Sequence, residues 1–430
     1  MVPSRRPLRL QRVPRFRGRF SLAGDKSVCH RLALLGAMAH GETRVGNFSS
    51  GADCASTLRC LSLLGVDIFR DGSDVRIRGE GPEAWRAAPG PLPAGNSGST
   101  LRMLAGALAG RPFATTLTGD ASLCRRPMER VAKPLRAMGA RVETTEGRPP
   151  LTIEGGGLKG VPWDLQVASA QVKTAVLLAG LQADGATIVN EPDPSRDHTE
   201  RLLPAFGAAL EVSGTAVSVR RTELRAFSMD APGDVSSAAF LLVAALVRPD
   251  SYVRIDGVLL NPRRTAFLDV LRAMGADVTT GITASTPEPT GWIEARSSRL
   301  HGVAIPASLV PALIDEVPAL AAAATQAEGV FTVSGAAELR VKESDRIAAL
   351  VAGLGRMGAS IEERPDGLAL EGGRPLRGAL VDSQGDHRIA MALAGAALAA
   401  EGETRIEDAA CVDISFPEFF ALLERGCRAE

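Results

Sequence analysis

The chain has 430 residues, of which 45% are apolar and 23% are charged, as is typical of globular proteins. The 49 Lys and Arg residues balance the 49 Asp and Glu residues. This neutrality argues against a general nucleic-acid binder, because neutralising phosphates needs a basic excess. The length predicts about two to three domains.

Neither a membrane span nor a metal site is predicted. The longest charge-free apolar stretches, 236–247 and 389–400, are shorter than the ~20 residues that a span needs, so they are expected to be buried helices. The six cysteines include no C-x-x-C pair, and only five histidines are present. We expect reduced, mostly buried thiols in a cytoplasmic protein, without a disulfide framework.

The chain begins with an arginine-rich segment. Its first 19 residues include seven arginines and no acidic residue. A transit peptide or an RNA-binding arm would explain this composition. A strand over 13–22 explains it better, because Phe16 and Phe20 alternate with Arg15, Arg17 and Arg19.

After this segment the chain repeats a pattern of about seventy residues. Each repeat has an amphipathic helix that stops at a glycine and is followed by a short strand, and the spacings between these glycines are 74, 68, 68, 83 and 68 residues. A glycine in this place is typical of the left-handed cap that ends a helix. The six glycines are Gly65, Gly139, Gly207, Gly275, Gly358 and Gly426.

A second helix precedes each of these, and it is apolar on nearly every face, which predicts burial. These helices are predicted to begin near Lys26, Ser97, Ser169, Val235, Leu313 and His387. Each unit therefore consists of a helix, a strand, a helix and two further strands. Six such units are too many for one core, so the simplest packing is two pseudo-symmetric α/β domains of three units each.

Polar residues gather where the buried helices begin. Helix capping explains residues such as Ser97 and Asp234 without any further role. Capping does not explain cations near a helix start, since they oppose the helix dipole. Four such cations, Lys26, Arg102, Lys173 and Arg388, indicate a bound anion. If the helices of each domain run parallel, their positive ends share one face, and two facing domains would form a positive cleft for a small, multiply anionic ligand.

Three charged segments precede outer helices, at 125–130, 196–201 and 340–346. Each segment taken singly is consistent with a solvated charged surface. Their recurrence at one position of the repeat favours a common cleft instead.

These residues together resemble the enolpyruvyl transferase family, in particular its 5-enolpyruvylshikimate-3-phosphate synthase branch. The resemblance runs from Gly24 to Pro417 and rests on nine motifs in the same order. The motifs are GDKS (24–27) with Arg31, GNSGSTLR (95–102), RRPMER (125–130), SAQVK (169–173), RDHTE (196–200), LIDEVPAL (313–320), RVKESDR (340–346), GDHR (385–388) and SFPEF (415–419).

The resemblance implies an α/β fold of two pseudo-symmetric domains, each built from three βαβαββ repeats. The buried helices are parallel, as in an inside-out α/β barrel, and the active site is expected in the interdomain cleft. One domain is expected to span 22–228 and the other 1–21 plus 229–430, with the N-terminal strand packed in the C-terminal half. A monomer is expected.

The resemblance also implies a reaction: transfer of the enolpyruvyl group of phosphoenolpyruvate to the 5-hydroxyl of shikimate 3-phosphate, with release of phosphate. No metal or organic cofactor is implied. The residues implied for shikimate 3-phosphate are Lys26, Ser27, Arg31, Ser169, Ala170, Gln171, Arg196, Asp315 and Lys342. Those implied for phosphoenolpyruvate are Lys26, Asn96, Gly98, Arg126, Gln171, Glu343, Arg346 and Arg388.

The implied mechanism is addition followed by elimination, and it needs two proton carriers. Asp315 is expected to serve the 5-hydroxyl and Glu343 to serve C3 of phosphoenolpyruvate, while Lys26 polarises the departing phosphate.

Three positions depart from the family pattern. Ile414 stands where some members have a lysine. Residues 261–265 (NPRRT) stand where one branch has N-x-T-R. Gly98 stands where other members of that branch have alanine, and it implies sensitivity to the inhibitor glyphosate.

Two alternative functions remain. The sister enzyme that acts on UDP-N-acetylglucosamine uses a cysteine in the loop that here contains Cys124, although GDKS, KESDR and GDHR favour the shikimate enzyme. A non-catalytic anion-binding module is the second alternative. Asp315 and Glu343 count against it, because pure anion binding gains nothing from carboxylates beside the cations.

Overall fold

The computed structural model describes residues 7–429, so Arg5 and Arg6 of the arginine-rich start lie outside the described residues. The chain divides into two compact units. Unit 1 contains the chain up to Leu22, Gly233–Ser285 and the chain from Pro289 onward, and unit 2 contains Ala23–Pro232 and Thr286–Glu288. The predicted domain boundaries fall at residues 22 and 229. The assignment of Thr286–Glu288 to unit 2 was not predicted.

Unit 2 contains three copies of one helix–strand–helix–strand–strand unit. The first copy is α1 (Lys26–Met38), β3 (Ala39–Gly46), α2 (Ala52–Leu63), β4 (Asp67–Asp71) and β5 (Asp74–Glu80). The second is α3 (Gly98–Leu108), β7 (Ala114–Thr118), α4 (Glu129–Ala137), β8 (Arg141–Thr145) and β9 (Arg148–Glu154). The third is α5 (Ala170–Gly180), β11 (Ala186–Asn190), α6 (His198–Leu202), β12 (Leu210–Ser213) and β13 (Ala216–Arg220). Short strands join them: β6 (Leu92–Pro93), β10 (Pro162–Asp164), β14 (Leu224–Arg225) and β15 (Met229–Asp230).

Unit 1 repeats this organisation. Its first copy is α7 (Val235–Leu246), β16 (Tyr252–Leu259), α8 (Ala266–Ala273), β17 (Asp277–Ala284) and β18 (Thr290–Arg296). The second is α9 (Val310–Leu313), α10 (Val317–Ala324), β20 (Val330–Val333), α11 (Arg346–Arg356), β21 (Ser360–Arg364) and β22 (Gly367–Glu371). The third is α12 (His387–Ala397), β24 (Glu403–Glu407) and α13 (Phe419–Arg428). The remaining strands are β1 (Leu8–Gln11), β2 (Arg17–Ser21), β19 (Ala304–Ile305) and β23 (Leu380–Asp382).

The sheets follow one connection pattern. In the order β6-β7-β9-β8, the first two strands are parallel and the hairpin strands are antiparallel, and β10-β11-β13-β12 and β19-β20-β22-β21 repeat this order. Remote segments complete the other three sheets. β14 and β15 pair with β3, β2 pairs with β16, and β1 pairs with β24. The expected pairing of the N-terminal strand with the C-terminal half is confirmed.

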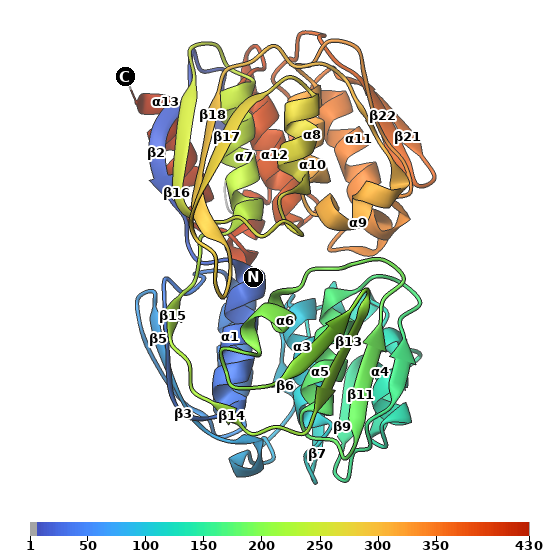
Figure 1. Ribbon diagram of the computed structural model, residues 1–430. Helices are drawn as coiled ribbons and strands as arrows, with labels where there is room; N and C mark the ends of the chain where they lie inside the picture. Colours follow the sequence, from blue (N-terminus) through green and yellow to red (C-terminus); the bar gives the residue numbers. More distant parts are fainter. Residues whose placement is uncertain (1–6, 430) are drawn as a thin grey trace. The chain divides into compact units, whose positions relative to one another are not determined.

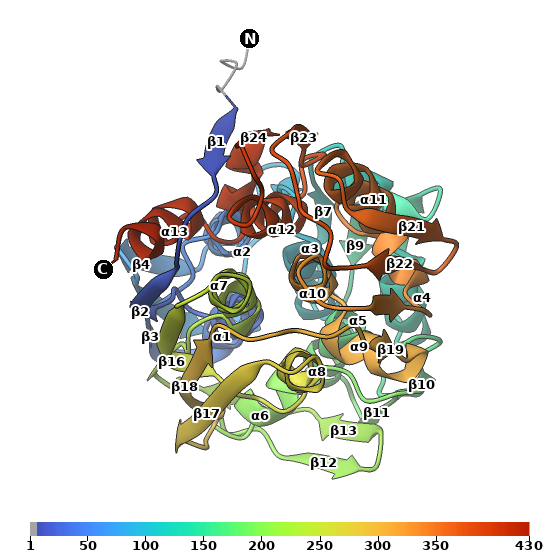
Figure 2. The same cartoon turned by 90° about the horizontal axis from the view of Figure 1, so that it is seen from above.

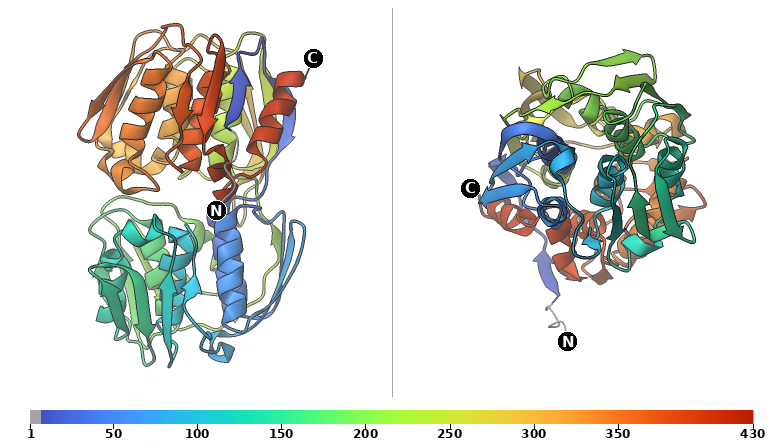
Figure 3. Two further views of the ribbon diagram at one scale, coloured as in Figure 1. Left: turned by 180° about the vertical axis from the view of Figure 1, so that it is seen from behind. Right: turned by 90° about the horizontal axis from the view of Figure 1, so that it is seen from below.

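In each unit the apolar helices lie inside and the strands lie outside. Figure 1 shows α1, α3 and α5 of unit 2 running side by side between strands, and the right-hand view of Figure 3 shows the same helices nearly end-on. In unit 1, α7, α10 and α12 pack together at the centre, and strands and the helices α8, α11 and α13 lie around them (Figure 2). Every residue of α7 and α12 is buried, as their apolar sequences predict. The expected two-domain α/β fold with buried helices is confirmed.

The glycine pattern is confirmed at five of its six positions. Gly65, Gly139, Gly207, Gly275 and Gly358 have φ between 83° and 105°, the left-handed region that ends a helix at little cost for glycine. The sixth prediction is wrong, because α13 continues past Gly426 to Arg428. A Cβ at Gly426 would overlap the ring of Phe16, so this glycine permits close packing and does not end the helix.

The predicted start of the fifth buried helix is also wrong. It was placed near Leu313, whereas α9 ends there and α10 begins at Val317. The ring of Pro318 would clash with the carbonyl group of Ile314 in a continuous helix, and proline donates no amide hydrogen bond. Asp315 and Glu316 therefore lie in the break between the two helices.

All six cysteines are free, and four of them are buried, as expected. Within 7–429, no single helix is long and apolar enough to cross a membrane. Only the bent pair Ala307–Leu313 and Val317–Ala324, at 111° to each other, passes the length and composition test when taken together. Over the same residues, no group of three or more His, Cys, Asp or Glu side chains is placed to hold a metal ion.

Candidate functional site

The N-termini of the three buried helices of unit 2 meet. Asp25, Ser97 and Ser169 cap α1, α3 and α5, each by accepting a hydrogen bond from a backbone amide of the first turn. The Gln171 amide donates to Ser99 Oγ at 2.8 Å, which ties α5 to α3. Arg31 Nη2 donates to the Ala170 carbonyl at 3.4 Å, which ties α1 to α5. Three positive helix ends therefore share one region, as an anion site requires.

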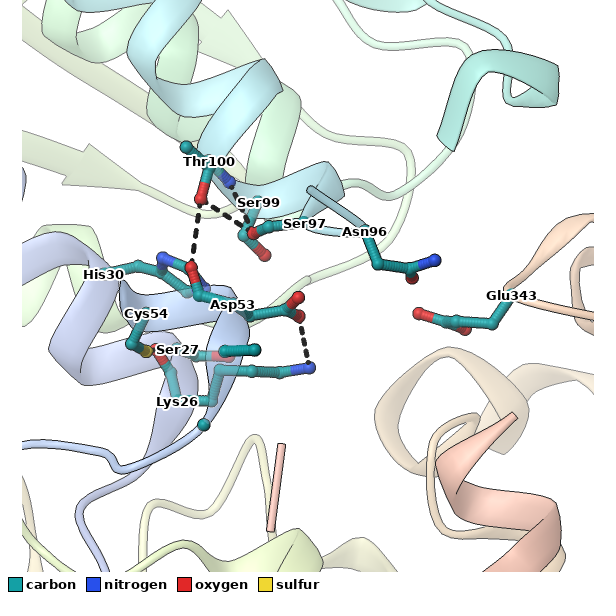
Figure 4. Close-up of polar contacts among 12 residues, drawn as sticks. Lys26, Ser27, His30, Asp53, Cys54, Asn96, Ser97, Ser99, Thr100 and Glu343 are labelled. Atoms are coloured by element: carbon teal, nitrogen blue, oxygen red, sulfur yellow. Dashed lines mark hydrogen bonds and ion pairs between the residues drawn. The ribbon is translucent and has the colours of Figure 1, made fainter. Parts of the chain in front are cut away.

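Lys26 is held in place by a carboxylate. Its Nζ lies 3.0 Å from Asp53 Oδ2, and these side chains are only 17% and 8% exposed. Asp53 lies in the first turn of α2, where the helix dipole favours a carboxylate. Behind it, Thr100 Oγ1 contacts the Asp53 carbonyl at 3.3 Å and Ser97 Oγ at 2.8 Å (Figure 4). The ammonium group at the start of α1 therefore has a fixed position.

Arg31 lies one turn further along α1 and is buried. Its guanidinium donates to Thr199 Oγ1 at 2.8 Å, to Thr174 Oγ1 at 2.9 Å and to the Ser27 carbonyl at 2.9 Å. Burial lowers the pKa of Arg31 to about 10, which still leaves it charged at neutral pH. Arg196 reaches the same helix start, with Nη1 3.5 Å from Ser27 Oγ.

A second group of cations lies at the start of α3. Arg126 Nη2 donates to Asn96 Oδ1 at 2.7 Å, and Arg102 Nη1 donates to Gln171 Oε1 at 2.7 Å. Gly98 lies between these guanidinium groups, since a Cβ there would be 2.8 Å from Arg102 Nη1 and 3.5 Å from Arg126 Nη1. A larger residue at 98 would have to displace Arg102.

Lys173 does not belong to the anion site that its place in α5 predicted. It is buried, with its Nζ 2.7 Å from Glu191 Oε2 and 2.6 Å from Glu200 Oε1. Its charge is therefore satisfied by two carboxylates of the protein. A cation in the first turns of a helix can serve an internal ion pair as readily as an external anion, and sequence reasoning did not distinguish the two.

The functional residues predicted in unit 1 surround one buried arginine. Arg346, only 1% exposed, donates to Asp386 Oδ2 at 2.8 Å, to Glu343 Oε2 at 2.6 Å and to Asp315 Oδ1 at 3.2 Å. Burial raises the pKa of Asp386, but the charge of Arg346 outweighs it and holds that pKa below its usual range. Three carboxylates are thus arranged on one guanidinium.

Two further cations approach Asp315 in the break between α9 and α10. Lys342 Nζ lies 3.6 Å from Asp315 Oδ1, and Arg388 Nη2 lies 3.9 Å from Asp315 Oδ2. Arg388 Nη1 also donates to the Asp315 carbonyl at 2.8 Å, which brings the starts of α10 and α12 together. Asp315 is thereby in contact with Lys342, Arg346 and Arg388.

The structure thus gathers the predicted residues into two clusters, one in each unit. The unit 2 cluster contains Lys26, Ser27, Arg31, Asn96, Gly98, Arg126, Ser169, Ala170, Gln171 and Arg196. The unit 1 cluster contains Asp315, Lys342, Glu343, Arg346 and Arg388.

Sequence reasoning missed two carboxylates that hold these cations. Asp53 begins an outer helix and carried no motif. Asp386 belongs to the GDHR motif but was attributed to a helix start alone. It does cap α12, yet its second oxygen binds Arg346. Both acidic residues stand at the start of an outer or a buried helix, where other repeats have cations. That coincidence is the sequence signal that could have identified them as partners of the cations.

The structure shows the surroundings of two positions that depart from the family pattern and of Cys124. Ile414 ends a short 3-10 helix, Ala409–Ile414, and is partly buried. Arg264 is buried and donates to Ser236 Oγ at 2.9 Å, so it belongs to the interior of unit 1. Cys124 is partly exposed in a 3-10 turn, Leu123–Arg125, and its Sγ donates to the Gly119 carbonyl at 3.4 Å.

Comparison with known proteins gives concordant matches. The family model described as EPSP synthase (3-phosphoshikimate 1-carboxyvinyltransferase) matches residues 10–423. The 3-phosphoshikimate 1-carboxyvinyltransferase of Desulforudis audaxviator is 50% identical over 408 residues, covering 94% of this chain and 95% of that one. The protein of the same name from Geobacillus kaustophilus is 49% identical over 415 residues, covering 95% and 97%.

Solved structures agree. The EPSP synthase of Acinetobacter baumannii has a TM-score of 0.86 and 42% identity, covering 97% of this chain and 98% of that one. The enolpyruvyl transferase NikO of Streptomyces tendae has a TM-score of 0.81 at 19% identity, covering 99% and 98%, and this likeness concerns the fold alone.

Proposed function

This chain belongs to the EPSP synthase (3-phosphoshikimate 1-carboxyvinyltransferase) family, and from that premise we propose how its two clusters carry out the family's reaction. The reaction transfers the enolpyruvyl group of phosphoenolpyruvate to the 5-hydroxyl of shikimate 3-phosphate and releases phosphate, as a step of the shikimate pathway. Both substrates carry several negative charges. Bringing them together therefore requires cations that cancel their repulsion and fix their orientation.

Each substrate is proposed to use residues from both clusters. Shikimate 3-phosphate is held by Lys26, Ser27, Arg31, Ser169, Ala170, Gln171 and Arg196 of unit 2 with Asp315 and Lys342 of unit 1. Phosphoenolpyruvate is held by Lys26, Asn96, Gly98, Arg126 and Gln171 of unit 2 with Glu343, Arg346 and Arg388 of unit 1. Support comes from the fixed position of Lys26 beside Asp53 and from the meeting of helix N-termini in unit 2.

The proposed chemistry is addition followed by elimination. The 5-hydroxyl gives its proton to Asp315 and attacks C2 of phosphoenolpyruvate, while C3 takes a proton from Glu343. The tetrahedral adduct then expels phosphate, polarised by Lys26, as C3 returns a proton to Glu343. Because Asp315 and Glu343 contact the same guanidinium, the protonation of one changes the charge that the other experiences.

The observation that carries this proposal is the arrangement of Asp315 and Glu343 on Arg346. A module that only binds anions would gain nothing from these carboxylates beside its cations, so their presence favours an enzyme. We also propose a monomer in the cytoplasm that uses no metal or organic cofactor and binds no nucleic acid. The six free thiols are consistent with a reducing compartment.

The test is phosphate release with both substrates and with each omitted in turn. We expect release only when both are present. UDP-N-acetylglucosamine in place of shikimate 3-phosphate should give none, and Cys124→Ser should retain activity. Turnover with the nucleotide sugar, or loss of activity in Cys124→Ser, would instead support the sister enzyme. Substrate binding without any phosphate release would support the non-catalytic module.

We expect Gly98→Ala to weaken inhibition of phosphate release by glyphosate. The added methyl group would lie 2.8 Å from Arg102 Nη1 and would displace that guanidinium, which donates to Gln171 of the proposed phosphoenolpyruvate site. One added methyl group in a close-fitting site changes binding by roughly 10- to 200-fold, so the half-inhibitory concentration should rise by at least about tenfold.

Gly395→Ala is the matched control, since nothing lies within 4 Å of a Cβ at this helical glycine. It should leave inhibition unchanged. Equal inhibition of the wild type and Gly98→Ala would show that the absence of a side chain at position 98 has no part in glyphosate binding.

A further inference from the structure

Lys173 holds both ends of a loop. Its side chain is 1% exposed, and its ammonium group contacts Glu191, which directly follows β11, and Glu200, which lies in α6. The ten residues from Glu191 to Glu200 therefore begin and end on one buried cation. Arg196, which the proposed function assigns to shikimate 3-phosphate, lies inside this loop.

Other contacts hold the loop internally and tie it to α5 and α1, which carry further residues of the cluster. Ser195, next to Arg196, donates its backbone amide to Glu191 Oε2 at 3.3 Å and its hydroxyl to Glu191 Oε1. Thr199, next to Glu200, contacts Thr174 Oγ1 of α5 at 2.6 Å and accepts from Arg31 of α1 at 2.8 Å. The loop is thus held on both sides of Arg196.

The charges of this group are unusual for a protein interior. One ammonium group faces two carboxylates, whose side chains are 2% and 10% exposed. Burial raises the pKa of Glu200, although Lys173 opposes the shift. A buried charge is stable only while its ion-pair partners stay in place. The two ion pairs of Lys173 therefore fix the positions of Glu191 and Glu200 and of the loop between them.

We propose that Lys173, through Glu191 and Glu200, is a positioning residue that sets the place of Arg196 for binding shikimate 3-phosphate. This inference rests on the proposed function of Arg196. It gives the lysine of the SAQVK segment a role that is neither substrate contact nor proton transfer. It also explains why a cation lies near the start of α5 without facing a ligand.

The experiment uses Glu200→Gln, which keeps the size of the side chain and leaves the Lys173–Glu191 pair intact. A displacement of about 1 Å in a positioning group changes rates or affinities by up to about 100-fold. We expect the KM for shikimate 3-phosphate and its Kd by calorimetry to rise about 10- to 100-fold, with the KM for phosphoenolpyruvate and the melting temperature near their wild-type values. The control is Glu211→Gln, an exposed glutamate of β12 in the same unit, which should change neither KM.

A double-mutant cycle distinguishes positioning from a merely structural role. If Glu200 acts through Arg196, then Glu200→Gln should have no further effect on the KM for shikimate 3-phosphate in an Arg196→Ala background. Lys173→Met, measured at temperatures at which it is folded, should raise the KM for shikimate 3-phosphate as Glu200→Gln does. Its control is Lys159→Met, at an exposed position, which should leave that KM unchanged.

Several results would overturn the inference. Additive effects in the cycle, equal changes in both KM values, or a KM for shikimate 3-phosphate that stays unchanged would each do so. A lower KM for shikimate 3-phosphate in Glu200→Gln would also overturn it, because the wild-type carboxylate would then act only by repelling the anionic substrate. A wild-type protein that releases no phosphate would instead remove the proposed function, so the two failures can be told apart.

Discussion

Glu343→Gln is expected to lower kcat by about 10²- to 10⁴-fold, the usual contribution of a positioned acid or base. Glutamine has the same shape and its Oε1 can still accept a hydrogen bond from Arg346, but it has no proton to give to C3 or to take back. Both KM values should change little, since the cations that bind the substrates remain. The measurement is phosphate release at saturating concentrations of both substrates.

Glu328→Gln, an exposed glutamate in unit 1, is the control and should retain wild-type kcat. Asp315→Asn should show a similar loss, because the 5-hydroxyl then lacks its proton acceptor. Unchanged turnover in either variant would remove that carboxylate from the mechanism.

Arg346→Met is expected to have the largest effect on stability. It leaves the buried Asp386 carboxylate without its main cation, and Asp315 and Glu343 each lose a hydrogen bond. Removing one partner of a buried ion pair typically costs about 3–5 kcal/mol. At roughly 2–4 °C per kcal/mol for a unit of this size, the melting temperature should fall by about 6–20 °C.

The loss should depend on pH in a defined direction. In the wild type the pKa of Asp386 is depressed, so its contribution to stability is present above the ordinary carboxyl pKa and is lost as the pH falls through the depressed value. Without Arg346, burial alone raises that pKa, so protonation at acidic pH relieves the unpaired charge. The difference in melting temperature between variant and wild type should therefore be smaller at pH 5 than at pH 8.

Arg356→Met, an exposed position at the end of the same helix, should melt close to the wild type at both pH values. A melting temperature of Arg346→Met equal to that of the wild type would mean that the three carboxylates do not depend on this guanidinium.

The sequence was informative where a property is local. Gly65 and its four counterparts mark helix ends because glycine adopts positive φ without strain, and α7 and α12 are apolar all round because they are buried. Gly426 also follows an amphipathic helical stretch, but its role is set by Phe16, which lies far away along the chain. No local pattern distinguishes these two uses of glycine.

The same limit applies to the charged residues. Motif order identified Arg346, Glu343 and Asp315, yet it did not reveal that Asp386 would join them or that Asp53 would hold Lys26. The partners of Lys173 were missed for the same reason. Which carboxylate meets which cation depends on how the helices pack, and that information is spread over the whole unit.

The pairing of β1 with β24 and of β2 with β16 has a consequence for biosynthesis. A nascent chain emerges from the ribosome with its N-terminus first, and a domain can fold once all of its segments have emerged. The stretch Ala23–Pro232 is nearly all of unit 2, so it can assemble while translation continues. Strand β2 must instead wait until its partner β16 (Tyr252–Leu259) has been made, and β1 must wait for β24 (Glu403–Glu407), near the end of synthesis. Until its partner is made, each of these strands presents unpaired backbone groups that can pair with another chain, so incomplete chains are expected to be more prone to aggregation than the finished protein.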